Sequence, residues 1–472
     1  MTNKHHSERL ALISIMLGAF ISLLDTTVVN VALPDITKAL HASSASIEWV
    51  VSGYALAFGL ILILAGRLGD KFGRKNLYMI GISLFLLMSI TAGFAQSETG
   101  LVLSRIVQGL SAGLFFPQIN AMLMDIFKSD KLGQAFGIFG SVIGIATAIG
   151  PFTGGLLIQL FGEENGWRFV FFVNVPFVIV TLILAALFLP KHNKTSKKVS
   201  FDFLSIFLLT VGLLFLLYPV ISNGAQGFKW QDILFMLISV PILIGLYFYS
   251  VRVTKQGKQP LISPTLLKNK TFTSGMILSL VYFAAFTSIF FVFSLTWQSG
   301  FGRSAIVSGL AISPYALGSM LAAANSNHFM QKLGRKLLII GLVFVMTGLA
   351  ATSFVFHLAG GAFSPWLTVF PLFLAGFGSG LIISPLNSIT LATVSEDDRG
   401  GASGIFNTAQ RVGSSFGIAI IGSVYFRALN ETSLQVVAEK YSFSLQMSIY
   451  INLLLLLVCL LLVFKLPKKI EA

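Results

Sequence analysis

Long apolar stretches alternate with short polar segments along the whole chain of 472 residues. A helix of about 20 apolar residues crosses the roughly 30 Å hydrocarbon layer of a bilayer, and each stretch reaches about that length. Backbone groups in lipid must be satisfied within their own segment, so these stretches are predicted to be helices. The pattern predicts fourteen spanning helices, over residues 10–33, 47–66, 77–95, 101–124, 134–160, 168–189, 203–221, 232–251, 271–297, 304–324, 337–357, 365–392, 401–426 and 444–464.

The placement of basic residues predicts how these helices are oriented. With both termini in the cytoplasm, the segments on that side contain 24 Lys and Arg residues, the outer segments six and the spans two, which accounts for all 32. Cytoplasmic loops of membrane proteins carry such an excess of Lys and Arg. We therefore expect a multi-pass protein of a bacterial cell membrane with both termini in the cytoplasm.

Composition narrows the class further. Hydrophobic residues make up 55% of the chain and charged residues 11%, against about 25% charged residues in a soluble domain. The net charge of +14 comes from basic residues in short loops, without the aromatic platform that single-stranded nucleic acids need, so no nucleic-acid partner is expected. The single cysteine, Cys459, excludes an intramolecular disulfide and a cysteine-rich metal site. We expect no cofactor and no metal, since the sequence has neither a phosphate-binding loop nor a His/Cys cluster.

One carboxylate lies deep inside an apolar stretch. Asp25 is placed about three-fifths of the way along the first stretch. An ionised acid at that depth costs roughly 3 kcal/mol, and intramembrane acids commonly mark proton paths. We interpret Asp25 as a protonatable coupling site. The alternative is an acid that is held neutral or hydrogen-bonded for helix packing.

Arg105, in the fourth stretch, is the candidate partner of Asp25. An arginine stays charged, so inside a membrane it needs an anion or water. If the two side chains meet, the guanidinium favours the ionised carboxylate while desolvation favours the neutral form, and the acid is expected to switch near neutral pH. The alternative is that Arg105 snorkels to the outer membrane interface.

Five motifs and one weaker copy follow one another along the chain. They are G-R-L-G-D-K-F-G-R-K over 66–75 with a copy ending in G-R-K over 327–336, R-x2-Q-G over 105–109, G-x3-G-x5-G-P-x2-G-G over 140–155, W-R-F-x2-F-x-N-x-P over 167–176, and G-x-S-G-x2-N-x3-R over 401–411. Glycines at this spacing permit tight reversals and close helix contacts. A proline inside a helix removes a hydrogen bond and bends it.

With these motifs the chain resembles the fourteen-helix drug:proton antiporters of the major facilitator superfamily, the branch of quaternary-ammonium and multidrug exporters. The resemblance implies an all-α membrane protein with the major facilitator fold, in which two six-helix bundles are repeated in parallel. The expected units are an N-terminal bundle over 1–189, an inserted helix pair with flanking cytoplasmic linkers over 190–270, and a C-terminal bundle over 271–472.

The resemblance also implies roles for individual residues. Proton coupling is expected at Asp25 and Arg105. A gating loop is expected at Gly66, Gly69, Asp70, Gly73, Arg74 and Lys75, and an antiporter motif at Gly144, Gly150, Pro151, Gly154 and Gly155. A substrate cavity is expected to include Asn30, Gln108, Asn174, Tyr282, Phe286, Phe290, Phe377, Asn407 and Arg411.

Some of these roles have alternatives. Asp70 is expected to cap a facing helix or to pair with Arg74 in a latch, but the loop also fits a plain positively charged turn. Asn174 is equally suited to an interhelical hydrogen bond. Each aromatic residue on its own is more typical of a lipid-facing or helix-packing position. Arg411 has no acid near it in sequence, so it is expected to meet an anionic substrate group or a proton-coupled network.

The expected function is secondary active transport rather than enzyme catalysis. The resemblance implies proton-coupled export of lipophilic drugs or toxic compounds that are neutral, zwitterionic or monocationic, hence multidrug efflux and antibiotic resistance. Alternatives are a dedicated exporter of an endogenous compound such as a siderophore, lipid or peptide, an importer, and a membrane-embedded enzyme or sensor. The expected partners are a small lipophilic substrate, protons and the lipid bilayer, and we expect a monomer.

Overall fold

The structure is a computed structural model, and it describes residues 2–127, 129–190, 202–223, 228–256, 260, 262–359, 364–394 and 399–467. Within these ranges every regular element is a helix. The side chains of some helical residues, Asp70 among them, lie outside the described part.

Two groups of six helices make up most of the structure. The first group is α1 (Thr2–Leu40), α2 (Ser44–Phe72), α3 (Arg74–Gly93), α4 (Glu98–Ile126), α5 (Ser129–Phe172) and α6 (Asn174–Phe188). The second group is α10 (Lys270–Leu295), α11 (Ala305–Leu333), α12 (Lys336–Ala359), α13 (Val369–Ala392), α14 (Arg399–Glu431) and α15 (Val437–Val463). The chain between them forms α7 (Phe203–Asn223), α8 (Trp230–Lys255) and α9 (Pro264–Lys268).

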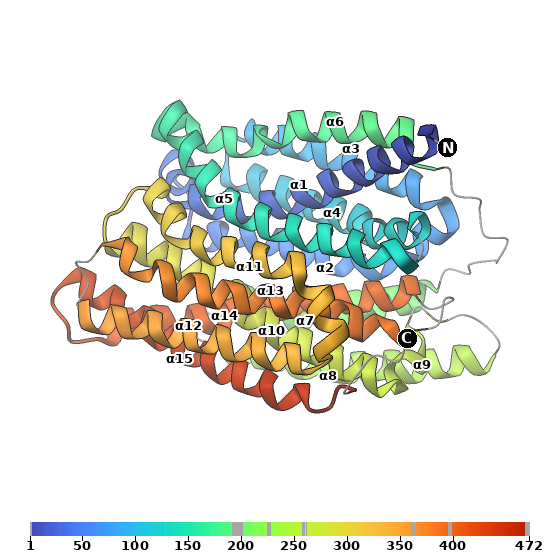
Figure 1. Cartoon of the computed structure of the whole chain (residues 1–472). Helices are drawn as coiled ribbons and strands as arrows, with labels where there is room; N and C mark the ends of the chain where they lie inside the picture. Colours follow the sequence, from blue (N-terminus) through green and yellow to red (C-terminus); the bar gives the residue numbers. More distant parts are fainter. Residues whose placement is uncertain are drawn as a thin grey trace.

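The same helix contacts recur in both groups. In the first, α1 packs against α5 and α6, and α4 against α2 and α3. In the second, α10 packs against α14 and α15, and α13 against α11 and α12. Figure 1 shows α1–α6 in the upper part of the molecule and α10–α15 in the lower part, with both chain ends at the same end of the helices. Each group therefore repeats one packing order.

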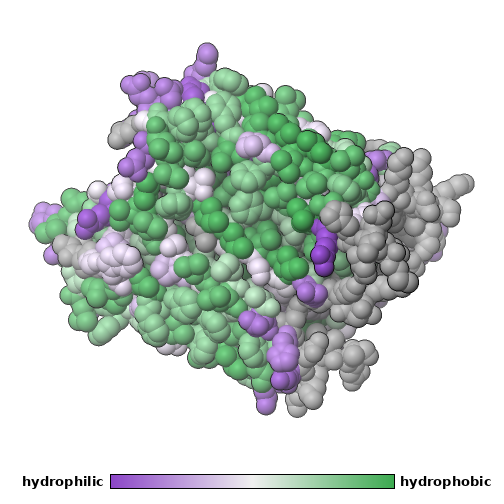
Figure 2. All heavy atoms as spheres, turned by 45° about the horizontal axis from the view of Figure 1, so that its top comes forward, coloured by the Kyte–Doolittle hydropathy of each residue, from purple (hydrophilic) through white to green (hydrophobic). Residues whose placement is uncertain are grey.

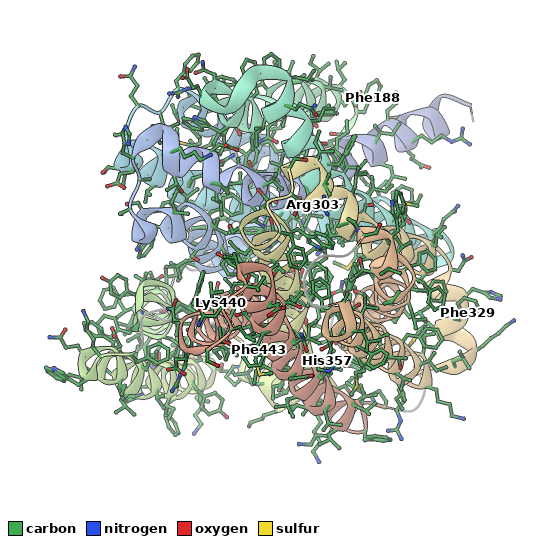
Figure 3. The ribbon with its side chains drawn as sticks, turned by 90° about the vertical axis from the view of Figure 1, so that its left-hand side faces the viewer. Phe188, Arg303, Phe329, His357, Lys440 and Phe443 are labelled. Carbon is green, nitrogen blue, oxygen red and sulfur yellow. The ribbon has the colours of Figure 1, made fainter. Side chains whose placement is uncertain are left out.

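Two helix pairs join the groups. α5 packs against α11, and α2 packs against α14. Each contact joins the fifth helix of one group to the second helix of the other. The two contacts are therefore equivalent in the repeat. α7 packs against α8 and also touches α2 and α14. Viewed end-on in Figure 3, the pale green helices of this pair lie beside both groups rather than between them.

The surface is that of a protein surrounded by lipid. In the described part, twelve helices are long and apolar enough to cross a membrane, and two further apolar helical stretches, Trp49–Leu62 and Leu204–Val220, are shorter. Large apolar side chains such as Leu187, Phe248 and Phe370 are exposed. Figure 2 shows hydrophobic residues over most of the visible face, with hydrophilic ones near its margins. Such exposure is unfavourable in water and expected in lipid.

Three local features differ from the sequence expectation. The short helix α9, of 5 residues, lies in the segment that was predicted to be a linker. The end of α10 continues as a π-helical turn over Thr296–Gly300. The fifth and sixth predicted helices are joined through α5, where Gly162 has non-helical torsions (φ 81°, ψ 160°). Glycine adopts such torsions without a Cβ penalty, so the chain reverses there with little intervening loop.

The two G-R-K turns both contain a glycine with positive φ. Gly73 (φ 93°) ends α2 and Gly334 (φ 55°) ends α11. Their N–H groups donate to the carbonyls of Gly69 at 2.9 Å and Met330 at 2.8 Å. A positive φ favours glycine, which explains why a glycine stands at this position in both copies.

Candidate functional site: a buried ion pair and the helix contacts beside it

Asp25 and Arg105 form an ion pair inside the first helix group. Nη1 of Arg105 lies 2.7 Å from Oδ2 of Asp25, and the side chains are 1% and 0% exposed, respectively. The geometry places an acid of α1 against a base of α4, two helices that are distant in sequence. Snorkelling of Arg105 to the outer interface does not fit this arrangement.

Two amides complete the surroundings of the carboxylate. Asn174 on α6 donates from Nδ2 to Oδ1 of Asp25 at 2.8 Å, and Gln108 donates from Nε2 to the same oxygen at 3.1 Å. Both amides also donate to the hydroxyl of Ser89 on α3, at 3.2 and 2.7 Å. Every contact of Asp25 in this network comes from a donor, an arrangement that suits a carboxylate acceptor.

Arg105 makes further contacts within the first helix group. Besides Asp25 it donates to Oε1 of Gln108 at 2.7 Å and, through Nε, to the carbonyl of Val50 at 3.1 Å. Its guanidinium carbon lies 4.3 Å from the ring centroid of Tyr54. Among the described residues the buried hydroxyl of Tyr54 has no hydrogen-bond partner. Tyr54 therefore meets Arg105 through the face of its ring.

The glycines of the antiporter motif bring α5 against α1 next to this network. A Cβ at Gly150 would overlap the hydroxyl of Thr27, and one at Gly154 would lie 2.8 Å from the carbonyl of Val28. A Cβ at Gly144 would lie 3.1 Å from the backbone of Met320 on α11. Small residues permit such close backbone approach. α5 is thus held against the acid-bearing helix on one side and the second group on the other.

The rest of this motif lies at the same interfaces. Gly155 is buried, and the backbone of Pro151 faces Gly309 of α11, where a Cβ would lie 2.9 Å away. The residues of the motif therefore lie at helix contacts within the first group and between the two groups.

The gating loop ties three helix ends together. Arg74 pairs with Asp125 at the end of α4, Nη1 to Oδ2 at 2.6 Å. Lys75 donates to the carbonyls of Ala186 and Leu189 at the end of α6, at 2.8 and 2.7 Å. These are orphan carbonyls of a helix C-terminus, which favour a cation.

The glycines of this loop differ in their contacts. A Cβ at Gly69 would overlap the side-chain amide of Gln118 on α4, whereas one at Gly73 would meet only Asn76 at 3.7 Å. Gly66 is buried. The expected latch through Asp70 falls on a side chain outside the described part.

Some predicted cavity residues line a pocket between the groups. The pocket has a volume of about 20 Å³ and is lined by Thr27, Asn30, Val31, Pro151, Phe290, Ser294, Ser308 and Ile312. This is room for about one water molecule. Asn30 contributes a buried Oδ1 that has no hydrogen-bond partner in the part of the chain that the structure describes. The predicted residues Asn30 and Phe290 are therefore together, in a space that is closed to a drug-sized compound in this conformation.

The other predicted cavity residues are dispersed. Gln108 and Asn174 belong to the Asp25 network. Tyr282 is buried and donates to Ser379 at 2.7 Å, and the ring of Phe286 packs between those of Tyr282 and Phe290.

The last three lie in other parts of the second group. Phe377 packs against Phe344 and Phe373. Asn407 donates to Ser403 at 3.3 Å on its own helix. Arg411 lies against α2, with its guanidinium carbon 4.0 Å from the ring centroid of Phe58.

Four residues that contact the predicted site residues were missed by the sequence analysis: Ser89, Tyr54, Phe58 and Asp125. Tyr54 and Phe58 are four residues apart on α2 and so share one face of the helix, a signal that could have marked them as an aromatic pair. Ser89 and Asp125 carry no comparable signal in a single sequence. Their roles depend on which helices become neighbours.

Comparison with known proteins places the chain among membrane transporters. A family model described as Major Facilitator Superfamily matches residues 15–418. The chain is 32% identical over 428 residues to the "Probable actinorhodin transporter" of Streptomyces coelicolor, covering 90% of this chain and 74% of that protein. It is 29% identical over 431 residues to "Multidrug resistance protein Stp" of Mycobacterium tuberculosis, covering 91% and 78%. The solved structure of a D-xylose-proton symporter matches with a TM-score of 0.66 and 15% identity over 97% of this chain and 98% of that one, a likeness of fold.

Proposed function

The chain belongs to the Major Facilitator Superfamily, and on that premise we propose that it is a proton-coupled exporter of lipophilic drugs or toxic compounds. It is a transporter and not an enzyme. The observation that carries the proposal is the buried Asp25–Arg105 ion pair. Buried ion pairs are weak sources of stability, because desolvation of the two charges offsets their attraction. An acid that is kept at this depth is therefore best explained by a change of charge during transport.

Protonation of Asp25 would alter the contacts of α1. A neutral carboxyl loses its attraction for Arg105 and turns one acceptor oxygen into a donor, so it no longer matches the donors on α4 and α6. α1 then becomes free to move relative to these helices. Since Gly150 and Gly154 seat α5 on α1 at Thr27 and Val28, such a movement reaches the α5–α11 contact between the groups. Alternating access requires this coupling of a charge change to the contact between the bundles.

Charge balance limits the cargo. One charge moving across ~150 mV supplies about 3.4 kcal/mol, which corresponds to roughly a 300-fold gradient at 1.4 kcal/mol per decade. That driving force is available when a neutral or zwitterionic compound exchanges for one proton. A monovalent cation exchanging for one proton moves no net charge, so only the pH gradient drives it. With a single coupling acid, we expect neutral, zwitterionic or monocationic substrates.

We propose fourteen crossings, as in the quaternary-ammonium and multidrug branch. α7 has 21 residues and would be about 31 Å long at 1.5 Å per residue, enough to cross the hydrocarbon layer. α2, which has 29 residues, is longer still. Together with the twelve long apolar helices of the described part, these two complete an even number, which agrees with both termini lying at one end of the molecule (Figure 1).

The proposed units are two bundles over 1–189 and 271–472, with an inserted pair over 190–270. The recurrence of the same helix contacts in α1–α6 and α10–α15 supports this division, and so does the position of α7 and α8 at the side of both groups. We propose that the protein is a monomer in the bacterial cell membrane. We propose that its termini are cytoplasmic because Lys and Arg are in excess in the loops at that end.

A second candidate is an exporter dedicated to one endogenous compound. One relative is named for a single compound, actinorhodin, whereas another is named for multidrug resistance. Competition decides between the two candidates. A multidrug pump should show mutual inhibition between chemically unrelated substrates such as norfloxacin and rhodamine 6G, and a dedicated exporter should not.

The proposal is tested by uphill transport in proteoliposomes with an imposed pH gradient. Norfloxacin and rhodamine 6G should accumulate with the wild type, and Asp25→Asn should abolish accumulation while leaving the protein folded. Glu431→Gln is the matched control, because Glu431 forms an exposed ion pair with Arg427 and should transport normally. Undiminished uphill transport by Asp25→Asn would end the coupling proposal.

A further inference from the structure

Arg411 is a second arginine inside a membrane-spanning helix, and its surroundings differ from those of Arg105. It lies within the span Gly401–Glu431 of α14. Its guanidinium carbon is 4.0 Å from the ring centroid of Phe58 on α2 and 5.7 Å from that of Phe116 on α4. Among the residues that the structure describes, no carboxylate lies within ion-pair distance of it. The side chain is partly exposed.

The polar groups near Arg411 do not neutralise it. Thr408 donates its hydroxyl to the carbonyl of Gly59 at 3.2 Å, and Ser415 donates to the carbonyl of Arg411 itself at 3.1 Å. Gln410 donates to Oδ1 of Asn387 at 3.4 Å. All of these side chains are neutral, and Asp25 is occupied by Arg105 and the two amides. The positive charge of Arg411 therefore remains without a counter-charge in the described part of the chain.

Aromatic rings compensate such a charge only in part. A cation over an aromatic face gains about 2 kcal/mol when both are desolvated, whereas a charge at the centre of a membrane helix costs roughly 3 kcal/mol on insertion scales and far more in simulations. A guanidinium that stacks on a ring keeps its in-plane N–H donors available for a carboxylate, phenolate or sulfonate. The site thus offers a cation with free donors beside two buried rings.

We propose that Arg411 binds an anionic group of the transported compound, with Phe58 and Phe116 packing against its aromatic body. This inference rests on the proposed function and adds a preference to it: aromatic substrates that carry a negative charge within a zwitterion should bind more tightly than those without one. Arg411 comes from the second helix group and the rings from the first. A ligand at this place would therefore touch both groups, as a substrate must if its binding is to influence their relative movement.

Equilibrium binding of a matched pair of probes tests the proposal. The probes are pyrene-1-sulfonate and pyrene-1-sulfonamide, which share an aromatic body and differ in charge. Binding is measured on the purified protein without any ion gradient. The wild type should bind the sulfonate at least tenfold more tightly than the sulfonamide. Arg411→Gln should abolish this preference while retaining sulfonamide binding and the melting temperature, and Arg411→Lys should reduce it.

The control variant is Arg427→Gln, which removes an exposed arginine of the same helix and should keep the full preference. Absence of a preference in the wild type overturns the proposal, and so does its persistence in Arg411→Gln. Equal loss of both probes together with a lower melting temperature would show that Arg411 only holds α14 against α2, which also overturns it. If Arg411→Gln does not fold, an unchanged preference in Arg411→Lys contradicts the proposal.

These outcomes are separable from failure of the proposed function. Asp25→Asn should retain the sulfonate preference, because Asp25 is not part of the anion site. A wild-type protein that prefers the sulfonate but shows no uphill transport driven by the pH gradient would refute the exporter mechanism alone. Intact coupling without anion selectivity would refute the Arg411 site alone.

Discussion

In the group α1–α6, the first, fourth and sixth helices are joined by an ion pair and two amides, whereas the corresponding helices α10, α13 and α15 are joined by neutral groups. Tyr282 donates to Ser379 between α10 and α13, and Ser288 donates to Asn452 between α10 and α15 at 3.3 Å. The helix contacts are the same in both groups, but the chemistry inside them is not.

The difference shows that packing alone does not require the charges. Neutral hydrogen-bonded pairs join the second group without the desolvation penalty that a buried ion pair carries. An acid that changes its charge can alter helix contacts, while a tyrosine or serine remains neutral over the physiological range. We infer that the first group contains the proton-responsive contacts and that the second serves as the reference against which it moves.

Removal of Arg105 should have the largest effect. Arg105→Gln leaves Asp25 buried without its cation, and unpaired buried charges typically destabilise by about 3–5 kcal/mol. We expect a large fall in melting temperature and loss of coupled transport. The double variant Asp25→Asn/Arg105→Gln should recover most of the stability but none of the coupling. If the single variant melts like the wild type, the pair is not buried as described.

A methyl group at the α1–α5 contact should have the next largest effect. In Gly150→Ala the new Cβ overlaps Thr27, and overpacking of this kind costs about 1–3 kcal/mol. Export should fall because α5 is pushed away from α1. Gly422→Ala is the control, since its Cβ would be 3.5 Å from the ring of Phe291, an ordinary contact. Equal transport by both alanine variants would contradict the role given to the close approach.

Breaking a neutral pair of the second group should have a smaller effect. Tyr282→Phe removes one hydrogen bond to Ser379, for a loss of about 1 kcal/mol. Uphill transport and its dependence on the pH gradient should be retained. Loss of proton coupling in this variant, measured in the same vesicles, would show that the second group also takes part in the proton step.

The smallest effect is expected at the C-terminal end of α14. Glu431→Gln breaks the ion pair with Arg427, whose side chain is 76% exposed, and exposed pairs four residues apart on a helix contribute only about 0.3–0.5 kcal/mol. Melting temperature and transport should match the wild type within error. A substantial loss of stability would mean that this exposed ion pair stabilises the protein as much as a buried one.

Much of the fold could be predicted from hydropathy, because the length and polarity of each apolar stretch define a helix without reference to the other helices. The Gly-Arg-Lys turns after α2 and α11 marked the repeat, since both need a glycine with positive φ. The join of the fifth and sixth predicted helices through Gly162 was not foreseen. A single glycine in an apolar run does not reveal whether it bends, breaks or continues a helix.

The site was less predictable, since its geometry depends on which helices meet. Asp25 and Arg105 stood out because charges are rare in apolar stretches. Gln108 and Asn174 were predicted as cavity residues, and in the structure both donate to the carboxylate of Asp25. Ser89 gave no signal, because a serine in an apolar helix is common. Burial of a polar residue can be expected from sequence, but its partner requires the tertiary contacts.

The central claim is that Asp25 changes its protonation state during transport. Infrared difference spectroscopy of the purified transporter, recorded with and without substrate across the pH range of transport, tests it directly. We predict a carbonyl stretch of a protonated carboxyl that appears and disappears with substrate and pH, and that is missing in Asp25→Asn. A carboxyl that stays ionised, or stays protonated, under all of these conditions would contradict the account.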